Sequence, residues 1–253
     1  MTSKTARPKF VYSNCPIVEA IIEVRFGLDG WDSTVPVRIY ENVRDKFPEK
    51  RDIQQVSIFI GASQGGQPPP PPPISQSPTM QLWNVDKSQL LQLGPGLATA
   101  NSLKYTTWAD FLPCVKGVIT QYLEVAQPST VTRIGTRYIN RFQFSEEELN
   151  LEKYFKFGLM LPVPITDLEG FDLTFLCKAP ALVAKGDKKV KTRFATEQVS
   201  DVILDIDCYA DGAMPADATF LVDAATKFHD HVEDVFESFL QQDLRSLLGA
   251  TQI

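Results

Sequence analysis

The stretch VTRIGTRYINRFQF, residues 131–144, decides the fold. Its β-branched and aromatic residues predict a long strand. Because side chains alternate between the two faces of a strand, one face carries Arg133, Gly135, Arg137, Ile139 and Arg141. The sequence therefore predicts a sheet with three arginines in a row on one of its faces.

Two further strands show the same division into an apolar face and a charged face. In the strand Cys15–Phe26 the apolar face comprises Val18, Ala20, Ile22, Val24 and Phe26, and the other face comprises Glu19, Ile21, Glu23 and Arg25. In the strand 201–209 the apolar face comprises Val202, Leu204, Ile206 and Cys208, and the other face comprises Asp201, Ile203, Asp205, Asp207 and Tyr209. Opposite charges from both ends of the chain are thus expected on one side of the sheet.

Amphipathic helices separate these strands. A short helix is expected over 33–47, before Pro48. Thr107 caps a second helix, in which Pro113 predicts a kink or a later start. A continuous apolar stripe predicts one long closing helix over 219–248.

The remaining segments complete the predicted order of elements. Ser145 with Glu148 forms a capping box, which indicates a short helix within 145–157. The segment 80–94 reads as a hairpin that turns at residues 86–88. Further strands are expected at 53–61, 97–103, 171–177 and 190–195.

Runs of adjacent strands with helices at the end of each half predict an α+β fold. We expect a single globular domain over 1–253, with a curved, largely antiparallel sheet and long amphipathic helices on one face. Residues 10–127 and 128–250 each follow a β-α-β-β-β-α order, which indicates two pseudo-repeats. A proline-rich loop insertion is expected at 62–79, because six consecutive prolines cannot pair in a sheet.

The composition excludes several classes of protein. Among 253 residues, 43% are hydrophobic and 22% charged, which excludes collagen, a coiled coil and a disordered chain. The net charge of −6 leaves no basic excess for a general polyanion binder, so nucleic acid is not expected as a partner. No segment has the roughly 18 apolar residues of a membrane helix, and no signal peptide is recognised, so we expect a cytoplasmic protein. The cysteines are expected to be reduced core residues: Cys15, Cys114, Cys177 and Cys208.

The charged face has two interpretations. It is either the solvated side of an antiparallel sheet, where exposed ion pairs contribute under about 1 kcal/mol each, or a concave ligand site. In a concave site the arginines would bind a carboxylate or phosphate, and Asp205 with Asp207 would hold a divalent cation. The candidate ligand-binding residues are Glu19, Glu23, Arg25, Arg133, Arg137, Arg141, Asp205 and Asp207.

An enzymatic alternative rests on the first strand. Triphosphate-tunnel enzymes open with Glu-x-Glu-x-Lys, which faces into a charged barrel with metal ligands. The pattern of Glu19, Ile21, Glu23 and Arg25 resembles it, with isoleucine in the middle and arginine for lysine. The resemblance implies a metal-dependent enzyme that processes phosphate or triphosphate on a charged concave sheet.

Other chemistry has less support. His229 and His231, the only histidines, point in different directions on the last helix, so no zinc pair is expected. His229 with Glu233 is expected to be a surface pair. No serine-hydrolase, Walker or dinucleotide motif is present. We therefore predict no catalytic residue, no metal and no cofactor.

Four stretches together resemble a sporadically distributed prokaryotic family of uncharacterised proteins. They are PIVEAIIEVRF (16–26), QLLQLGPGLATANSLKYTTWADF (89–111), RIGTRYINRF (133–142) and VILDIDCY (202–209). The matching residues are Arg133, Gly135, Arg137, Tyr138, Asn140, Arg141, Asp205 and Asp207. The resemblance implies a cytosolic prokaryotic protein and carries no activity to these positions, and the proline insertion departs from the family pattern.

These observations favour a non-enzymatic binding or protein-interaction module. Its expected partner is a protein or a small anionic ligand. The charged positions have the spacing of paired or recognition residues, while nothing supplies a nucleophile, a base and an oxyanion donor together. The length of the closing apolar stripe also predicts a homodimer.

Overall fold

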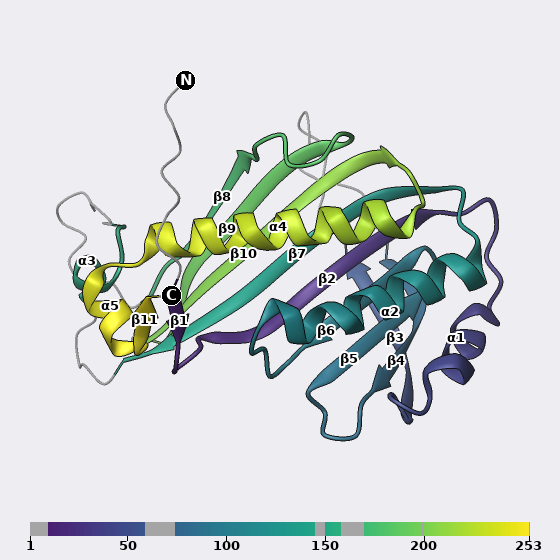
Figure 1. Ribbon diagram of the computed structural model, residues 1–253, viewed down its shortest axis with the longest axis horizontal. Coiled ribbons are helices and arrows are strands. Elements are labelled where there is room, and N and C mark those ends of the chain that lie inside the picture. The colour runs from purple at the N-terminus through teal and green to yellow at the C-terminus, as the bar shows by residue number, and fades with distance from the viewer. Residues whose placement is uncertain (1–9, 59–73, 145–149, 158–169, 199, 253) are drawn as a thin grey trace.

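The computed structural model describes residues 10–58, 74–144, 150–157, 170–198 and 200–252. The strands are β1 (Phe10–Tyr12), β2 (Ile17–Gly27), β3 (Glu49–Ile58), β4 (Ile74–Trp83), β5 (Gln89–Gly94), β6 (Leu97–Ser102), β7 (Thr130–Gln143), β8 (Asp172–Lys178), β9 (Asp187–Gln198), β10 (Asp201–Met214) and β11 (Ala250–Gln252). Nine of them form one antiparallel sheet in the order β3-β4-β5-β6-β2-β7-β10-β9-β8 (Figure 1). β1 and β11 form a separate pair.

Two long helices cover one face of the sheet. The helices are α1 (Val35–Val43), α2 (Trp108–Ala126), α3 (Leu151–Tyr154), α4 (Ala218–Phe239) and α5 (Gln242–Leu247). α4 lies along β7 and β10, and α2 lies against β6 and beside α4 (Figure 1). None of the helices in the described part of the chain is long and apolar enough to span a bilayer. The α+β fold, with an antiparallel sheet and long helices on one face, is therefore as predicted.

We call the side of the sheet under α2 and α4 the helix face. Thr136 and Tyr138 of β7 bond to Ala225 and His229 of α4, so the even-numbered residues of this part of β7 point to the helices. The opposite side is called the open face. The arginines of β7 lie on the open face, as the alternation predicted.

The two halves of the chain meet at the centre of the sheet. β2, the first strand that the first half contributes to the nine-stranded sheet, pairs with β7, the first strand of the second half. Within each half the first strand also pairs with the last, β2 with β6 and β7 with β10. Besides β1, which lies outside the nine-stranded sheet, the first half has one strand more than the expected order, because β3, β4, β5 and β6 follow α1. The pseudo-repeats stay a prediction.

The core lies between the helix face and the two long helices. Tyr122 of α2 stacks on Phe26 of β2 with ring centroids 4.4 Å apart, and its hydroxyl donates to the Gly94 carbonyl at 2.9 Å. Leu221 and Phe228 of α4 are fully buried. The apolar stripe of α4 therefore packs on the sheet of its own chain, as the hydrophobic effect favours.

The closing helix is shorter than the expected helix over 219–248. α4 ends at Phe239, because Leu240 is extended and forms a β-bridge with Phe155. Arg245 of α5 donates to the Leu240 carbonyl at 2.9 Å, and so provides a hydrogen bond to a carbonyl that has no partner within α4. The apolar stripe does not reveal this helix end, because Phe155, whose β-bridge holds Leu240 in an extended conformation, is distant in the sequence.

The expected loop insertion at 62–79 extends too far. β4 begins at Ile74, and Pro78 pairs with Gln54 of β3. β5 pairs with β4 only from Met80 onward, so Pro78 has one neighbouring strand, and a missing amide donor is tolerated there. The proline run itself lies outside the described residues.

The apolar face of the first strand is right except at its start. Val18 is 44% exposed. Ile17 pairs with Asn140 while Glu19 pairs with Ile139, so two steps along β2 match one step along β7. This bulge turns Val18 away from the core, and bulges leave little trace in a pattern of alternation.

A side chain caps the first turn of both α2 and α3. The Thr107 side chain accepts the Asp110 N–H, so the predicted cap is confirmed. α2 begins at Trp108 with Pro113 inside it, so of the two expectations for Pro113 the later start is wrong and the kink stays a prediction. The short helix exists as α3, where Asn150 accepts the Lys153 N–H. The capping box at 145–148 lies outside the described residues.

The cysteines are free, as expected, but only Cys208 is a buried core residue. Cys15 and Cys177 are exposed, and Cys114 is half-buried. Cys177 lies on β8, at the edge of the sheet, where no neighbouring element of the described chain covers it.

A large-to-small change under α4 tests this packing. We expect Phe228→Ala to lower the free energy of unfolding by about 3–5 kcal/mol, because the ring is fully buried between α4 and the sheet. Urea unfolding followed by circular dichroism measures it. Val85→Ala, at a residue 80% exposed, is the control and should change stability by less than about 0.5 kcal/mol. Equal effects would contradict the placement of α4.

Candidate functional site

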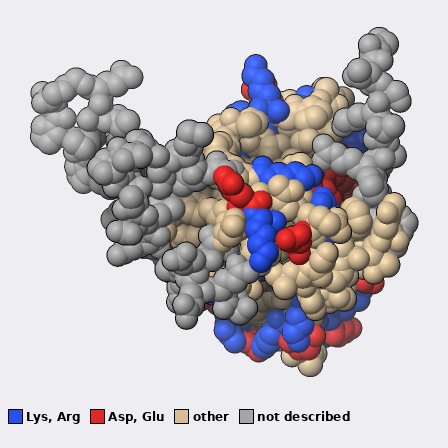
Figure 2. All heavy atoms as spheres, turned by 90° about the vertical axis from the view of Figure 1, so that its left-hand side faces the viewer, with Lys and Arg blue, Asp and Glu red and all other residues tan. Residues whose placement is uncertain are grey.

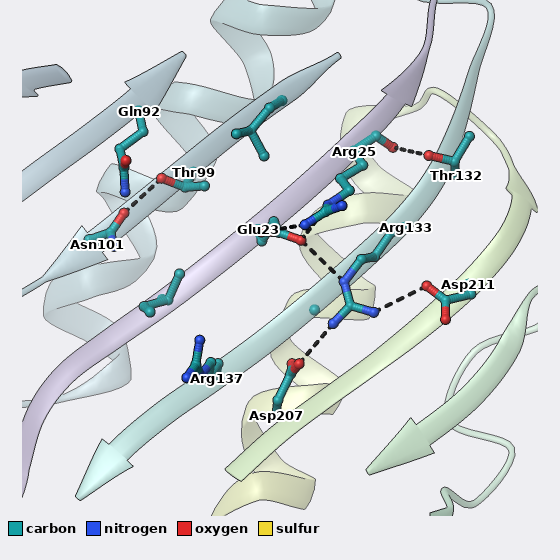
Figure 3. A pocket seen from close by; sticks show the side chains of 13 residues that line it. Glu23, Arg25, Gln92, Thr99, Asn101, Thr132, Arg133, Arg137, Asp207 and Asp211 are labelled. Carbon is teal, nitrogen blue, oxygen red and sulfur yellow. Dashed lines mark hydrogen bonds and ion pairs between the residues drawn. The ribbon is translucent and has the colours of Figure 1, made fainter. Parts of the chain in front are cut away.

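A hollow of about 540 Å³ lies on the open face. Five neighbouring strands line it, from β5 across β6, β2 and β7 to β10 (Figure 3). β2, β7 and β10 supply a charged wall of Glu23, Arg25, Arg133, Arg137, Asp207 and Asp211, and β5 and β6 supply a neutral wall of Gln92, Leu97, Thr99 and Asn101. The predicted charged face is therefore hollowed at the centre of the sheet.

Antiparallel register places the arginines of β7 beside the aspartates of β10. Arg137 lies opposite Asp207 but bonds to Asp205 with two parallel contacts, Nε to Oδ1 at 2.8 Å and Nη2 to Oδ2 at 2.6 Å. Arg141 bonds to Asp201 in the same diagonal direction. Two-point guanidinium–carboxylate contacts are strong and directional, so they hold β7 and β10 in this register.

Arg133 is held by three carboxylates. Its Nε donates to Glu23 at 3.2 Å, its Nη1 to Asp211 at 3.1 Å and its Nη2 to Asp207 at 2.8 Å. The guanidinium carbon lies 3.6 Å from the centroid of the Tyr209 ring. We call these five residues the Arg133 cluster. It ties β2, β7 and β10 together, and each nitrogen of the guanidinium is already bonded (Figure 3).

Gly135 makes room for this cluster. It pairs directly with Tyr209, between Arg133 and Arg137 on the open face. A Cβ at this position would lie 3.0 Å from the Tyr209 Cβ and 3.2 Å from Asp207 Oδ1. The missing side chain therefore lets Arg133 lie over the tyrosine ring and reach Asp207, and it leaves bare backbone at the floor of the hollow.

Burial sets the protonation behaviour of the cluster. Burial opposes the charge of Arg133, but Asp207, Glu23 and Asp211 raise its pKa above the ordinary value. Burial raises the pKa of Asp207 to about 6, although Arg133 and Arg137 lower it, and Glu23 and Asp205 add to the rise. The charged wall thus contains a carboxyl that titrates just below neutral pH.

The neutral wall is also organised by hydrogen bonds. Thr99 donates its hydroxyl to Asn101 Oδ1 at 2.7 Å, and Asn101 Nδ2 donates to Glu19 Oε1 at 2.7 Å. Gln92 lies next to both in Figure 3, and its amide makes no side-chain hydrogen bond among the described residues. Gln92 therefore keeps donors and acceptors for a bound molecule.

Most of the predicted site residues come together. Glu23, Arg25, Arg133, Arg137 and Asp207 line the hollow. The other three do not line it: Glu19 bonds to Asn101, Asp205 holds Arg137, and Arg141 pairs with Asp201 further along the strands.

The other residues that line the hollow were not among the predicted site residues. Asp211 continues the alternation of Asp205 and Asp207, so the period of two contained a signal for it. Gln92, Thr99 and Asn101 are neutral, and only the pairing of β6 with β2 and β5 brings them to the hollow. That pairing is not readable from their own segments.

His229 and Glu233 form the expected pair, but only Glu233 lies at the surface. His229 is buried on the helix face, with Nδ1 2.7 Å from the Tyr138 hydroxyl and its ring stacked on Trp108 at 4.6 Å. Glu233 Oε1 lies 3.4 Å from its Nε2. Ligand-type atoms of His229, Asp230 and Glu233 lie within 4.8 Å of one another, whereas the carboxylates of the predicted cation pair, Asp205 and Asp207, are held by arginines.

Charges on another side of the molecule are mixed. Viewed from the end that carries α3 and α5, basic and acidic side chains are interspersed rather than gathered into one basic surface (Figure 2). This distribution does not resemble the continuous basic face that binds a phosphate backbone.

No protein-family model matches the chain, and a comparison with curated proteins finds no match either. The resemblance drawn from the four sequence stretches stays a prediction. The function must therefore be argued from the geometry of the hollow.

Removing the central guanidinium tests the Arg133 cluster. We expect Arg133→Met to lower the free energy of unfolding by about 3 kcal/mol, because Glu23, Asp207 and Asp211 lose their shared partner in a mostly buried setting. The matched control is Arg44→Met, which removes an exposed ion pair with Glu41 and should cost less than about 0.5 kcal/mol. Chemical denaturation of both variants measures the difference, and equal losses would refute the cluster.

The pKa of Asp207 predicts a pH dependence of stability. Its value rises from 3.8 to about 6 on folding, so between these pH values the folded chain keeps a proton that the unfolded chain releases. This carboxyl therefore destabilises the fold increasingly as the pH rises through that window. We expect the stability of Asp207→Asn relative to the wild type to rise with pH over the same window and to stay level above it.

Unfolding midpoints measured at several pH values check this expectation. Asp223→Asn, at an exposed residue of α4 paired with Lys227, is the control. Its stability relative to the wild type should change much less across the window. A level difference for Asp207→Asn would show that burial does not control this carboxyl.

Proposed function

We propose that the chain is a non-enzymatic binding protein, and that the hollow on its open face takes a small anionic ligand. The observation that carries the proposal is the unequal use of the three lining arginines. All three guanidinium nitrogens of Arg133 donate to carboxylates. Arg25 and Arg137 each donate through Nε and Nη2 to one carboxylate, and their Nη1 atoms have no hydrogen bond among the described residues. These two guanidiniums support recognition of a carboxylate or phosphate.

The surroundings of the two arginines also suit a ligand. Ile21 lies opposite Arg137 in the register of β2 with β7, and Gly135 lies opposite Glu23, two residues from Arg25. The neutral wall, which includes the Gln92 amide, lies across the hollow from the arginines (Figure 3). Most of the lining is charged or polar, so hydrogen bonds rather than apolar contact would fix the orientation of a bound molecule. The hollow supports a ligand with one anionic end and one neutral polar end.

The lining supports binding better than catalysis. Among the described residues that line the hollow there is no histidine, cysteine, serine, lysine or tyrosine, and the two threonine hydroxyls donate to Asn101 Oδ1 and to the Arg25 carbonyl rather than to a carboxylate that could act as a base. The lining carboxylates Glu23, Asp207 and Asp211 all accept hydrogen bonds from Arg133, and of these Asp207, with a pKa raised to about 6, is the one able to exchange a proton near neutral pH.

The alternative is a metal-dependent phosphate- or triphosphate-processing enzyme. It needs carboxylates that are free to ligate a cation, but Glu23 accepts from Arg25 and Arg133, Asp205 from Arg137, and Asp207 from Arg133. The sheet is also open, with β3 and β8 at its two ends, unlike a closed tunnel. Both observations favour the binding protein.

Anion binding tests the proposal. We expect inorganic pyrophosphate to bind the purified chain, and Arg25→Gln to weaken this binding about tenfold, the loss of one charge-assisted hydrogen bond. Isothermal titration calorimetry measures the affinity. Arg51→Gln is the matched control, because Arg51 pairs with Glu49 two residues away on β3 as Arg25 pairs with Glu23 on β2, but outside the hollow.

Two results would overturn the proposal. Equal affinity of wild type, Arg25→Gln and Arg51→Gln would place anion binding elsewhere. Hydrolysis of triphosphate by the wild type with magnesium or manganese, abolished by Asp205→Ala with Asp207→Ala, would establish the enzymatic alternative instead.

A further inference from the structure

The edge strand β8 has the sequence DLTFLCK, Asp172–Lys178, and is exposed on both of its faces. Phe175 is 40% exposed and Leu176 is 62% exposed, which is unusual for large apolar side chains in a strand. In the described part of the chain β8 pairs only with β9, so its outer side has no neighbouring strand. Such an edge is a template for another strand.

Hydrogen bonds at the two ends of β8 show which backbone groups point outward. The Phe171 carbonyl accepts the Thr196 N–H at 2.9 Å, and the Ala179 N–H donates to the Lys188 carbonyl at 3.0 Å. In an antiparallel strand, alternate residues bond to the same neighbour, so the odd-numbered residues from 171 to 179 face β9. The backbone groups of Asp172, Thr174, Leu176 and Lys178 therefore face outward.

This strand is complementary to itself. Asp172 and Lys178 lie three residues on either side of Phe175 and on the same face of the sheet. An antiparallel second copy centred on Phe175 would place each Asp172 opposite Lys178 of the other copy, and each Thr174 opposite Leu176. The backbone groups of all four residues face outward and can bond to the second copy. One register therefore pairs opposite charges, keeps paired side chains on one face and satisfies the backbone hydrogen bonds.

We propose that two copies of the chain associate through β8 in this two-fold antiparallel register and form one continuous sheet. The open faces of both copies then lie on the same side. Asp172, which Arg193 holds at 2.8 Å, gains Lys178 of the second copy, and Lys178 makes no ion pair of its own among the described residues. The two Phe175 rings meet on the helix face, next to the Phe157 rings.

Among the described residues, two of the usual protections against pairing, a bulge and a proline, are absent from this edge. The register of β8 with β9 runs without a bulge from Asp172 to Lys178, and the strand contains no proline. One acidic and one basic residue make the strand neutral, so its charge favours neither an acidic nor a basic partner. A second copy is the occupant whose charges match both ends.

Reversal of the two charges tests the interface. Light scattering of the wild type should give twice the 28.3 kDa of one chain. Asp172→Lys and Lys178→Asp should each halve the mass, because each puts like charges opposite one another at two symmetric places. The double variant Asp172→Lys with Lys178→Asp should restore the dimer. Asp187→Lys, the same change on β9 away from the edge, should remain a dimer.

A cross-link provides a second measurement that does not depend on the charge variants. Phe175→Cys would place two thiols opposite each other on the two-fold axis, at a separation that suits a disulfide. Mild oxidation should convert it to a covalent dimer on a non-reducing gel, while the wild type, with exposed Cys15 and Cys177, should not convert. A wild-type mass of one chain throughout a dilution series, or a dimer unaffected by both single reversals, would overturn the proposal.

Discussion

The contact between Arg133 and its three carboxylates is the interaction on which the rest of the structure depends. It joins β2 of the first half to β7 and β10 of the second, at the point where the halves meet. A buried guanidinium needs all of its partners, so the three strands are held in one register rather than in several near-equivalent ones. The position of the hollow follows from that register, because its charged wall and the Gly135 floor belong to the same three strands.

Much of this could be predicted from the sequence because a strand has a period of two. Alternation alone assigned Arg133, Arg137 and Arg141 to one face, and it assigned Asp205 and Asp207 to the same side of the sheet. It did not reveal which carboxylate each arginine would choose. Arg137 bonds diagonally to Asp205 rather than to Asp207 directly opposite, and that choice depends on side-chain reach and on the space that Gly135 leaves.

The parts that were not predicted share a physical cause. The break after Phe239, the bulge at Val18 and the neutral wall at Thr99 are each produced by hydrogen bonds to residues far away in the sequence. Local periodicity reports the burial of a side chain and contains little information about a distant backbone partner. The buried His229 is a further case, since its partners Tyr138 and Trp108 come from other elements.

The same charges that fix the register also shape what the open face can do. If every arginine of this face were bonded through all three of its nitrogens, as Arg133 is, no guanidinium nitrogen would be left for a ligand, and the face would serve only solubility and strand order. The pairing here is uneven: one arginine is shared by three carboxylates while Arg25 and Arg137 are each held by one. Because three carboxylates bond to Arg133, its neighbours Arg25 and Arg137 each have one carboxylate and keep an Nη1 that is unbonded among the described residues. A site for an anion can therefore arise on a wall whose formal charges are balanced, because the balance holds for the wall as a whole and not for each arginine.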